Sequence, residues 1–439
     1  MRRRDALRWI GGGMAALAAR PLWAAPAARD DFFIFIHAAG GWDITLWADP
    51  RNERKGLVEP ASSDNTDIAA LALWKSVALD GDTDTFEILD HRFGPGIGPL
   101  FDKRDRLTVI NGLAMNTVSH PDGTTYSATG RHLAGGRAVA ASVDVAIASE
   151  RGAEQLLPAV AVQFPSAFVG ERLDRRAIPL RVASAGTIAK SLTRSDAYLD
   201  DGDRAAISAV LADEAAGLAG RSVFPEVYDR IASQHLAQPQ LIGGELEKAF
   251  APKALADRYP QFDYKAKNLG AGALAAAFAV EAIRRDVVRC VGFALGGLDT
   301  HNQNYKQHAH TLQELFGTIA TLVDLLDATP HPHATGTRLS DRTHILVFSD
   351  FCRTPQINLA GGRDHYPNNS ALVISPRFRG GLTFGKSDFE QLLPADAKRF
   401  SDGARPIAPP DLLATFLHAF GIEPRAYLRD GEVVPELLR

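Results

Sequence analysis

Acidic and imidazole side chains gather just after several apolar runs of this 439-residue chain. Such mixed oxygen and nitrogen donors suit divalent zinc, manganese, magnesium or calcium, and two ions close together can clamp an anionic ester during its displacement. Taken singly, an Asp after Gly-Gly is better explained as a turn former or a helix cap. Because four segments carry such groups, we predict a shared divalent metal site whose ligands are Asp43, Asp299, His301, Asp350 and His365.

Arg353 follows Asp350 closely and precedes Asp364 in the same stretch of chain. Its planar guanidinium can hold an anionic substrate through parallel hydrogen bonds. The same group can instead pair with Asp350 or Asp364 and brace the loop. The sequence leaves both roles open, and Arg353 is carried forward as a candidate catalytic residue.

Other histidines have simpler explanations. His37 lies at the end of the first apolar run and is expected to be a core histidine with its hydrogen bonds satisfied. His308 and His310 lie at the start of a helical pattern, on its polar side, and are expected at the surface. His331 and His333 lie in a loop bounded by Pro and Gly, where exposure to solvent is expected.

Strands must position the candidate groups. Six short apolar runs have the composition of strands buried on both faces, as in a parallel sheet covered by helices. Each run ends in a loop rich in Gly or polar residues, and ligands of such sheets bind at the carboxyl ends of the strands. The predicted fold is therefore α/β, a mostly parallel sheet covered by helices on both faces. The runs are 31–37, 106–111, 159–163, 290–295, 343–348 and 371–374.

Helical patterns fill the intervals between these runs. Apolar residues at three- and four-residue spacing over 312–326 predict a helix that completes a βαβ unit between Cys290 and Phe348. The segment from about 200 to 288 is rich in Ala and Glu and predicts a helical insertion, including a helix over 271–289. A last helix is predicted over 409–421, with an acidic N-cap candidate, Asp411, and a glycine stop.

The first 27 residues differ in composition from the rest of the chain. They hold five arginines and one acid, an apolar run over 9–19 and small residues over 22–27, which are the three regions of an export signal. Arg3 and Arg4, with the glycines at 11–13, resemble a twin-arginine signal. We expect recognition by the twin-arginine export machinery, cleavage near 25–27, a periplasmic location and one mature domain over 28–439. An ordinary amphipathic or disordered N-terminus is the alternative.

Composition, cysteine spacing and the absence of certain motifs exclude several classes of function. With 48 Lys and Arg against 52 Asp and Glu, the chain lacks the basic field that nucleic-acid binding requires. No run outside the N-terminal segment approaches the roughly 18 apolar residues of a transmembrane helix, so no stable membrane insertion is expected after cleavage. The two cysteines show no metal-binding or redox spacing. Neither a phosphate-binding glycine loop nor a Gly-x-Ser-x-Gly motif is present.

Three motifs resemble a known family. They are Gly40-Gly-Trp-Asp43, Gly296-Gly-Leu-Asp-Thr-His301 and Ser349-Asp-Phe-Cys-Arg-Thr-Pro355, the last followed by Asn358, Gly361 and Asp364-His365. Together they resemble the bacterial exported family called domain of unknown function 1501, over about residues 31–425. Asp350 stands where that family usually has Glu, and Cys352 where it usually has Gly. The carboxylate is therefore kept on a side chain one methylene shorter.

This family in turn is similar to the alkaline phosphatase and sulfatase superfamily, whose sheet carries a metal site and a covalent nucleophile. The resemblance implies an alkaline phosphatase-like fold, with the nucleophile at Ser119 and His120 as a metal ligand or proton donor. The alternative is a polar loop whose hydroxyls cap the following helix. Neither the sulfatase Cys-x-Pro-x-Arg motif nor the phosphatase Asp-Ser-Ala motif is present.

Two functions follow from these observations. The first is an exported metal-dependent hydrolase that acts on a phosphate or sulfate ester, either a small molecule or a polymer. The second is an exported binding or assembly protein that keeps the fold without turnover, with Trp42, Trp47 and the helical segment as a partner surface. The clustered carboxylates and histidines favour the first function, and the missing nucleophile motif favours the second.

Overall fold

The structure is a computed structural model that describes residues 30–50, 86–88, 91–93, 95–152, 155–192, 200–218, 245–388 and 390–439. The segment predicted to be an export signal lies outside these residues, and so does the middle of the predicted helical insertion. Among the described residues, no helix combines the length and hydropathy needed to cross a membrane.

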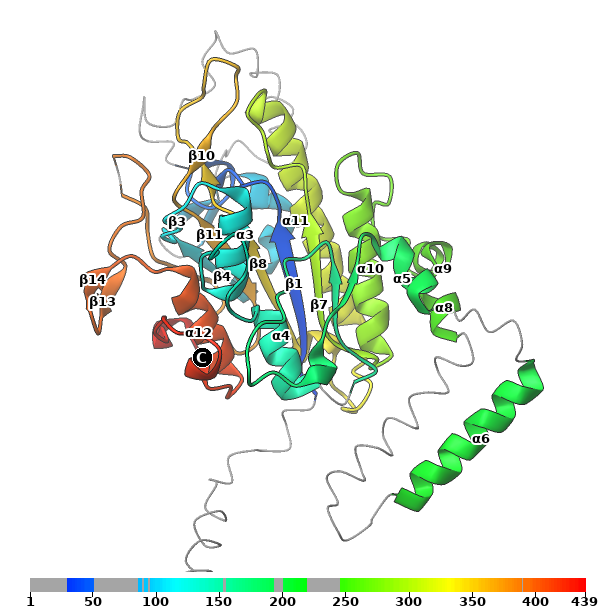
Figure 1. The fold of residues 1–439 in the computed structure, drawn as a ribbon. Coiled ribbons are helices and arrows are strands. Elements are labelled where there is room, and N and C mark those ends of the chain that lie inside the picture. Colours follow the sequence, from blue (N-terminus) through cyan, green and yellow to red (C-terminus); the bar gives the residue numbers. More distant parts are fainter. Residues whose placement is uncertain are drawn as a thin grey trace, which may run out of the picture.

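An eight-stranded sheet forms the centre of the molecule (Figure 1). β11 runs antiparallel to its neighbours β4 and β8, and the other adjacent pairs are parallel. The predicted mostly parallel sheet is confirmed, and each of the six apolar runs forms one of its strands. In order across the sheet the strands are β12 (Leu382–Phe384), β4 (Leu107–Asn111), β11 (Ser370–Ile374), β8 (Thr343–Ser349), β1 (Phe32–Ala38), β7 (Val288–Leu295), β5 (Leu157–Val162) and β6 (Leu180–Val182).

Both faces of the sheet are covered by helices, as predicted. Phe32, Ile34 and Ile36 of β1 belong to one apolar cluster, which includes residues of α10 (Gly270–Arg284) and α11 (Asn304–Ala328). Phe33 and Phe35 belong to another, which includes residues of α4 (Val143–Ile147) and α12 (Pro409–Ala419). A strand covered on both sides needs apolar residues at every position. This is why the run 31–37 is continuous rather than alternating.

The helix predictions hold in part. The apolar positions over 312–326 are buried along α11. The helix predicted over 271–289 is too long, because α10 ends at Arg284 and Val288 already begins β7. Asp411 is not the N-cap of α12. Ala408 occupies that position, and the Asp411 carboxylate accepts a hydrogen bond from the Ala408 N–H at 2.9 Å from inside the first turn.

Apart from α6, with 18 residues, and η3, with 12, the remaining elements have 10 residues or fewer. In the described part of 200–288, α8 and α9 pack beside α10. The helices are α3 (His120–Thr129), α5 (Ile188–Leu192), α6 (Asp201–Leu218), α8 (Glu245–Phe250) and α9 (Pro252–Arg258). Three strand pairs lie outside the main sheet: β2 (Phe86–Ile88) with β3 (His91–Phe93), β9 (Cys352–Arg353) with β10 (His365–Tyr366), and β13 (Lys398–Phe400) with β14 (Gly403–Arg405). Single turns are η2 (Ile44–Leu46), η4 (Ala148–Gly152), η5 (Arg175–Ala177), η6 (Ala185–Thr187), η7 (Leu339–Asp341), η8 (Pro424–Ala426) and η9 (Pro435–Leu437), and η3 (Pro95–Arg106) is longer.

Glycines allow the segments at the carboxyl end of the sheet to meet. A Cβ atom on Gly40, in the loop after β1, would lie 2.5 Å from the backbone nitrogen of Asp299, in the loop after β7. A Cβ atom on Gly123 of α3 would lie 2.3 Å from the carbonyl oxygen of Asp350, in the loop after β8. Real Cβ atoms do not approach backbone so closely. These two glycines therefore let the loops after β1 and β7, and α3 with the loop after β8, pack in contact.

Candidate metal centre

Polar side chains from four parts of the chain come together at the carboxyl end of the sheet. In Figure 1 the arrowhead of β1 points toward the side of the molecule that carries β10. The loops after β7 and β8 contribute to this cluster together with the first residue of α3 and the first residue of β10. The titratable members of the cluster are His120, Asp299, His301, Asp350, Asp364 and His365.

Three imidazole nitrogens in this cluster surround one carboxylate oxygen. Asp299 Oδ1 lies 3.2 Å from His301 Nε2, 3.4 Å from His120 Nε2 and 3.8 Å from His365 Nε2. The Nε2 atoms of His301 and His365 are 2.9 Å apart. A tetrahedral zinc ion with bonds of about 2.0–2.1 Å holds its ligand atoms about 3.3 Å apart. The ligand atoms of His120, Asp299 and His365 all lie within 4.8 Å of one another.

The other ring nitrogen of each imidazole already has an acceptor. A carboxylate or carbonyl oxygen can only accept, so each Nδ1 carries a proton, and in the neutral imidazole Nε2 then keeps its lone pair. His120 Nε2 is moreover buried without a hydrogen-bond partner in the structure. Histidines held in this way are ready to ligate a metal through Nε2. The acceptors are Asp364 for His301 at 2.8 Å, the Val118 carbonyl for His365 at 2.7 Å, and Asp350 for His120 at 2.6 Å.

Arg353 is a buried residue that holds Asp299 of the cluster in place. Its guanidinium is fully buried, and Nη2 donates to Asp299 Oδ1 at 2.5 Å. It also donates to backbone carbonyls, at 2.9 Å to Gly41, at 3.0 Å to Arg363, and to Gly40, and its Nη1 lies 3.5 Å from His301 Nε2. Burial alone raises the pKa of Asp299, but the hydrogen bond and charge of Arg353 bring the net pKa below its ordinary value. Of the two roles that the sequence left open, these contacts match bracing, with Asp299 as the partner instead of Asp350 or Asp364.

Asp350 lies behind His120. It is nearly fully buried, and its Oδ2 accepts hydrogen bonds from His120 Nδ1 at 2.6 Å and from the Gly40 N–H at 3.2 Å. Its Oδ1 is hydrogen-bonded to His37 Nε2. Burial alone raises the pKa of Asp350, but the charges and hydrogen bonds of His37 and His120 hold it well below its ordinary range. The sequence predicted a metal ligand, whereas both oxygens here face protein donors and orient an imidazole.

Asp43 is not part of the cluster. It is fully buried at the start of η2, where Oδ1 accepts from the Thr45 N–H at 3.0 Å. Its Oδ2 accepts from Asn304 Nδ2 at 2.7 Å and lies 3.3 Å from Arg363 Nε. The helix-cap explanation that the sequence offered for an Asp after Gly-Gly therefore describes these contacts. The structure does not bring Asp43 together with the other predicted ligands.

His308 is fully buried, and its predicted surface position is wrong. Its Nε2 accepts a hydrogen bond from the Asp43 N–H at 2.7 Å, and Nδ1 lies 2.9 Å from Thr300 Oγ1. Burial lowers the pKa of His308 to about 3. The polar side of the first turns of α11 faces the loop after β1 rather than water, which the helical pattern alone could not reveal. His310 is exposed, as predicted.

Ser119 is the N-cap residue of α3 and directly precedes His120. The residue is exposed, and its side chain makes no cap hydrogen bond to the helix. The hydroxyl-capping explanation therefore has no contact to support it.

Two contributors to the cluster were missing from the predicted site. Asp364 directly precedes His365 in the sequence, so its position next to a predicted ligand could have identified it. Val118 acts through its backbone carbonyl. Because every residue type has such a carbonyl, no sequence pattern could have identified it.

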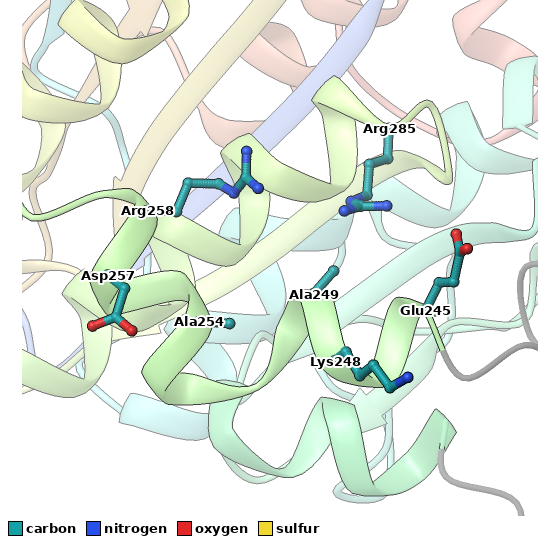
Figure 2. Close-up of a pocket in the computed structure, with 7 residues that line it drawn as sticks. All are labelled: Glu245, Lys248, Ala249, Ala254, Asp257, Arg258 and Arg285. Atoms are coloured by element: carbon teal, nitrogen blue, oxygen red, sulfur yellow. The ribbon is translucent and has the colours of Figure 1, made fainter.

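A separate hollow of about 640 Å³ lies against α8 and α9 (Figure 2). Its lining mixes charges, with Lys248, Arg258 and Arg285 beside Glu245 and Asp257. Among the residues that the structure describes, no imidazole lines it, and Arg285 donates to the buried Glu281 of α10 at 2.6 Å. The hollow therefore lacks the donor set found at the carboxyl end of the sheet.

Two solved structures are similar to most of this chain. One is Ps i-CgsB in complex with k-i-k-neocarrahexaose, at 12% identity and a TM-score of 0.37, covering 92% of this chain and 75% of that chain. The other is BT4656 in complex with its substrate D-glucosamine-2-N,6-O-disulfate, at 9% identity and a TM-score of 0.35, covering 93% of this chain and 82% of that chain. No curated protein matches.

A family model tests the family resemblance that the three sequence motifs suggested. The model described as protein of unknown function (DUF1501) matches residues 33–432, a range that holds every member of the cluster. The chain belongs to the DUF1501 family.

Proposed function

We propose that this protein is a metal-dependent hydrolase in which His120, Asp299, His301 and His365 hold one divalent ion. The observation that supports this proposal is the convergence of three imidazole Nε2 atoms on one carboxylate oxygen, with every Nδ1 already engaged. Calcium and magnesium prefer sites built from oxygen, whereas imidazole suits zinc and similar transition-metal ions. Zinc is therefore the proposed ion.

The proposed substrate is a phosphate or sulfate ester. A divalent ion in this position would polarise an ester oxygen and lower the pKa of a nearby water molecule. The side chains of Asp299 and His301 are about half exposed, at 52% and 45%, so an ester in solution can reach the cluster. The amino end of α3 begins at His120, and the partial positive charge there favours an anion. Arg353, whose donors are engaged inside the protein, is a positioning residue.

Ser119 is the proposed attacking group, with water as the alternative. Its exposed hydroxyl lies beside His120 and is not used to cap α3. Replacing Ser119 with Ala separates the two possibilities, because the variant should keep its metal. Turnover that is lost in Ser119→Ala at unchanged zinc content supports the serine, and turnover that survives supports water.

Metal content and turnover test the function together. We expect one zinc ion per wild-type chain and hydrolysis of an aryl phosphate or an aryl sulfate. His365→Ala should lose both properties. His310→Ala, which removes an exposed imidazole of α11 outside the cluster, should keep both. Absence of bound metal from purified wild-type protein contradicts the metal centre. Bound metal without turnover of either ester, in zinc and in manganese, favours the non-catalytic binding protein.

We also propose that the chain is exported to the periplasm through the twin-arginine machinery. The support is the arrangement of Arg3-Arg4, the apolar run over 9–19 and the small residues over 22–27. Replacing both arginines with lysine should trap the precursor in the cytoplasm, as measured by fractionation and by the mass of the mature N-terminus. Arrival of processed protein in the periplasm despite the double substitution contradicts this route.

A further inference from the structure

His37 is a buried imidazole that the proposed chemistry does not use. It lies near the end of β1, between β7 and β8, and is only 5% exposed. In the register of β1 with β8, His37 lies opposite Phe348. β8 ends one residue further on, at Ser349, and Asp350 follows directly. The backbones of two paired strands therefore fix His37 beside Asp350.

Asp350 connects His37 to the proposed ligand His120. One carboxylate oxygen is hydrogen-bonded to His37, and the other accepts from His120 Nδ1 and from the Gly40 N–H. The carboxylate is 2% exposed, so an oxygen that lost its donor would remain unpaired away from water, which is strongly unfavourable. The group would then rotate or take up a proton. Either change disturbs the acceptor that orients His120.

We propose that His37 is a positioning residue of the metal centre and that it acts through Asp350 to keep His120 Nε2 facing the ion. This inference rests on the proposed metal centre. His120 must donate from Nδ1 for Nε2 to keep its lone pair, and a fixed acceptor is what selects that tautomer. His37 holds the acceptor from the side remote from His120. One residue each from β1, α3 and the loop after β8 therefore acts as a unit.

A role confined to core packing predicts a different result. Replacing His37 would then lower the stability of the protein with or without zinc and leave the zinc affinity unchanged. The chain offers a matched control in His344, which lies on β8 and is 1% exposed. Its Nε2 is 3.4 Å from Asp31 Oδ1 at the opposite end of the sheet.

The test compares zinc affinity, measured by competition with a chromogenic chelator, with the unfolding temperature in the presence and absence of zinc. His37→Gln keeps an N–H donor near the position of Nε2, whereas His37→Asn and His37→Phe do not. We expect the Asn and Phe variants to bind zinc about 10- to 100-fold more weakly and the Gln variant to stay within about threefold of the wild type. His344→Phe should lose stability and keep its zinc affinity.

The outcomes separate failure of this inference from failure of the metal centre. Wild-type affinity in both His37→Asn and His37→Phe overturns the positioning role, and so does a Gln variant as weak as the Phe variant. If His37→Phe fails to fold, the smaller polar Asn variant decides. A wild-type protein that binds no zinc overturns the metal centre and this inference together. Zinc binding that is indifferent to His37 overturns this inference alone.

Discussion

The two ends of the central sheet each hold a buried carboxylate beside a buried imidazole. At the carboxyl end, one Asp350 oxygen is hydrogen-bonded to His37, and the other accepts from His120 Nδ1 at 2.6 Å. At the amino end, His344 Nε2 lies 3.4 Å from Asp31 Oδ1, and neither of these two atoms has a hydrogen-bond partner in the structure. The same pair of residue types therefore has different surroundings at the two ends.

The surroundings decide what such a pair can do. The charged groups beside the Asp31 carboxylate include Arg342 at 3.5 Å and Arg377 at 4.0 Å, and a guanidinium carries donors without a lone pair for a metal. Burial alone raises the pKa of Asp31, but His344 and these arginines bring it below its ordinary value, while burial lowers the pKa of His344. We therefore propose a metal centre only at the end where further imidazole nitrogens converge on an acid.

Removing the shared carboxylate should have the largest effect. Asp299→Ala deletes the oxygen that lies near three imidazoles and releases Arg353 from its carboxylate partner. We expect zinc affinity to fall by more than about 100-fold, beyond the loss typical of an outer partner. Chelator competition measures the loss. Asp31→Ala, at the other end of the sheet, should reduce stability and leave affinity unchanged, and equal affinity losses in the two variants would remove the distinction between the ends.

Asp350→Asn should have a smaller effect on the same measurement. The amide keeps the shape of the side chain but loses the full negative charge that His120 Nδ1 and His37 Nε2 face. Zinc affinity is expected to fall by about 10-fold or more. An affinity and a stability equal to those of the wild type would show that the buried charge has no part in orienting His120.

Gly123→Ala tests whether close packing of α3 positions His120. The added methyl group would meet the Asp350 carbonyl at 2.3 Å, so α3 must move away from the loop after β8. We expect zinc affinity to fall by about 10-fold, as for a displaced outer partner. Gly217→Ala in α6, where the new Cβ atom would have no atom within 4 Å, is the control and should bind zinc normally. Normal zinc affinity in Gly123→Ala would show that α3 tolerates the shift.

We expect the smallest effect on the metal centre from replacing Glu281, which, like Asp31, is a buried acid partnered by arginines. Glu281 is fully buried and hydrogen-bonded to Arg284, Arg285 and Tyr259. Burial alone raises its pKa, but these partners lower it to about 2. A lowered carboxyl pKa adds stability that is complete above the unfolded value of about 4.5 and is lost as pH falls toward 2.

Urea unfolding at pH 5, 4 and 3 should therefore show the stability advantage of the wild type over Glu281→Gln shrinking with acidity. The zinc affinity of the variant at neutral pH should equal that of the wild type. A stability difference that stays constant from pH 5 to pH 3 would contradict the lowered pKa. A change in zinc affinity would contradict the view that arginine-partnered acids are structural.

The strands were predictable from sequence because a strand buried on both faces leaves a continuous apolar run. The direction of β11 was not, because its composition is the same as that of the parallel strands and direction depends on the connections. The short edge strands β6 and β12 were missed, since partly exposed residues leave no such run.

The cluster was predictable as far as side chains of the right type follow the right strands. Asp299, His301 and His365 were found in this way. Asp43 and Asp350 share that pattern, yet the structure directs their oxygens to protein donors. Which donor meets which acceptor depends on packing between segments, such as that between Gly123 and Asp350. No pattern in a single sequence predicts this packing.

The four proposed ligands come from three stretches of chain that are far apart in sequence, at 120, 299–301 and 365. An ion bound to all of them closes two long loops of the polypeptide, as a cross-link would. Unfolding must then release the ion, so the stability of the protein should rise with the free zinc concentration once that concentration exceeds the dissociation constant. A protein moved between compartments with different zinc levels would thus change its resistance to heat and to proteases without any change in sequence.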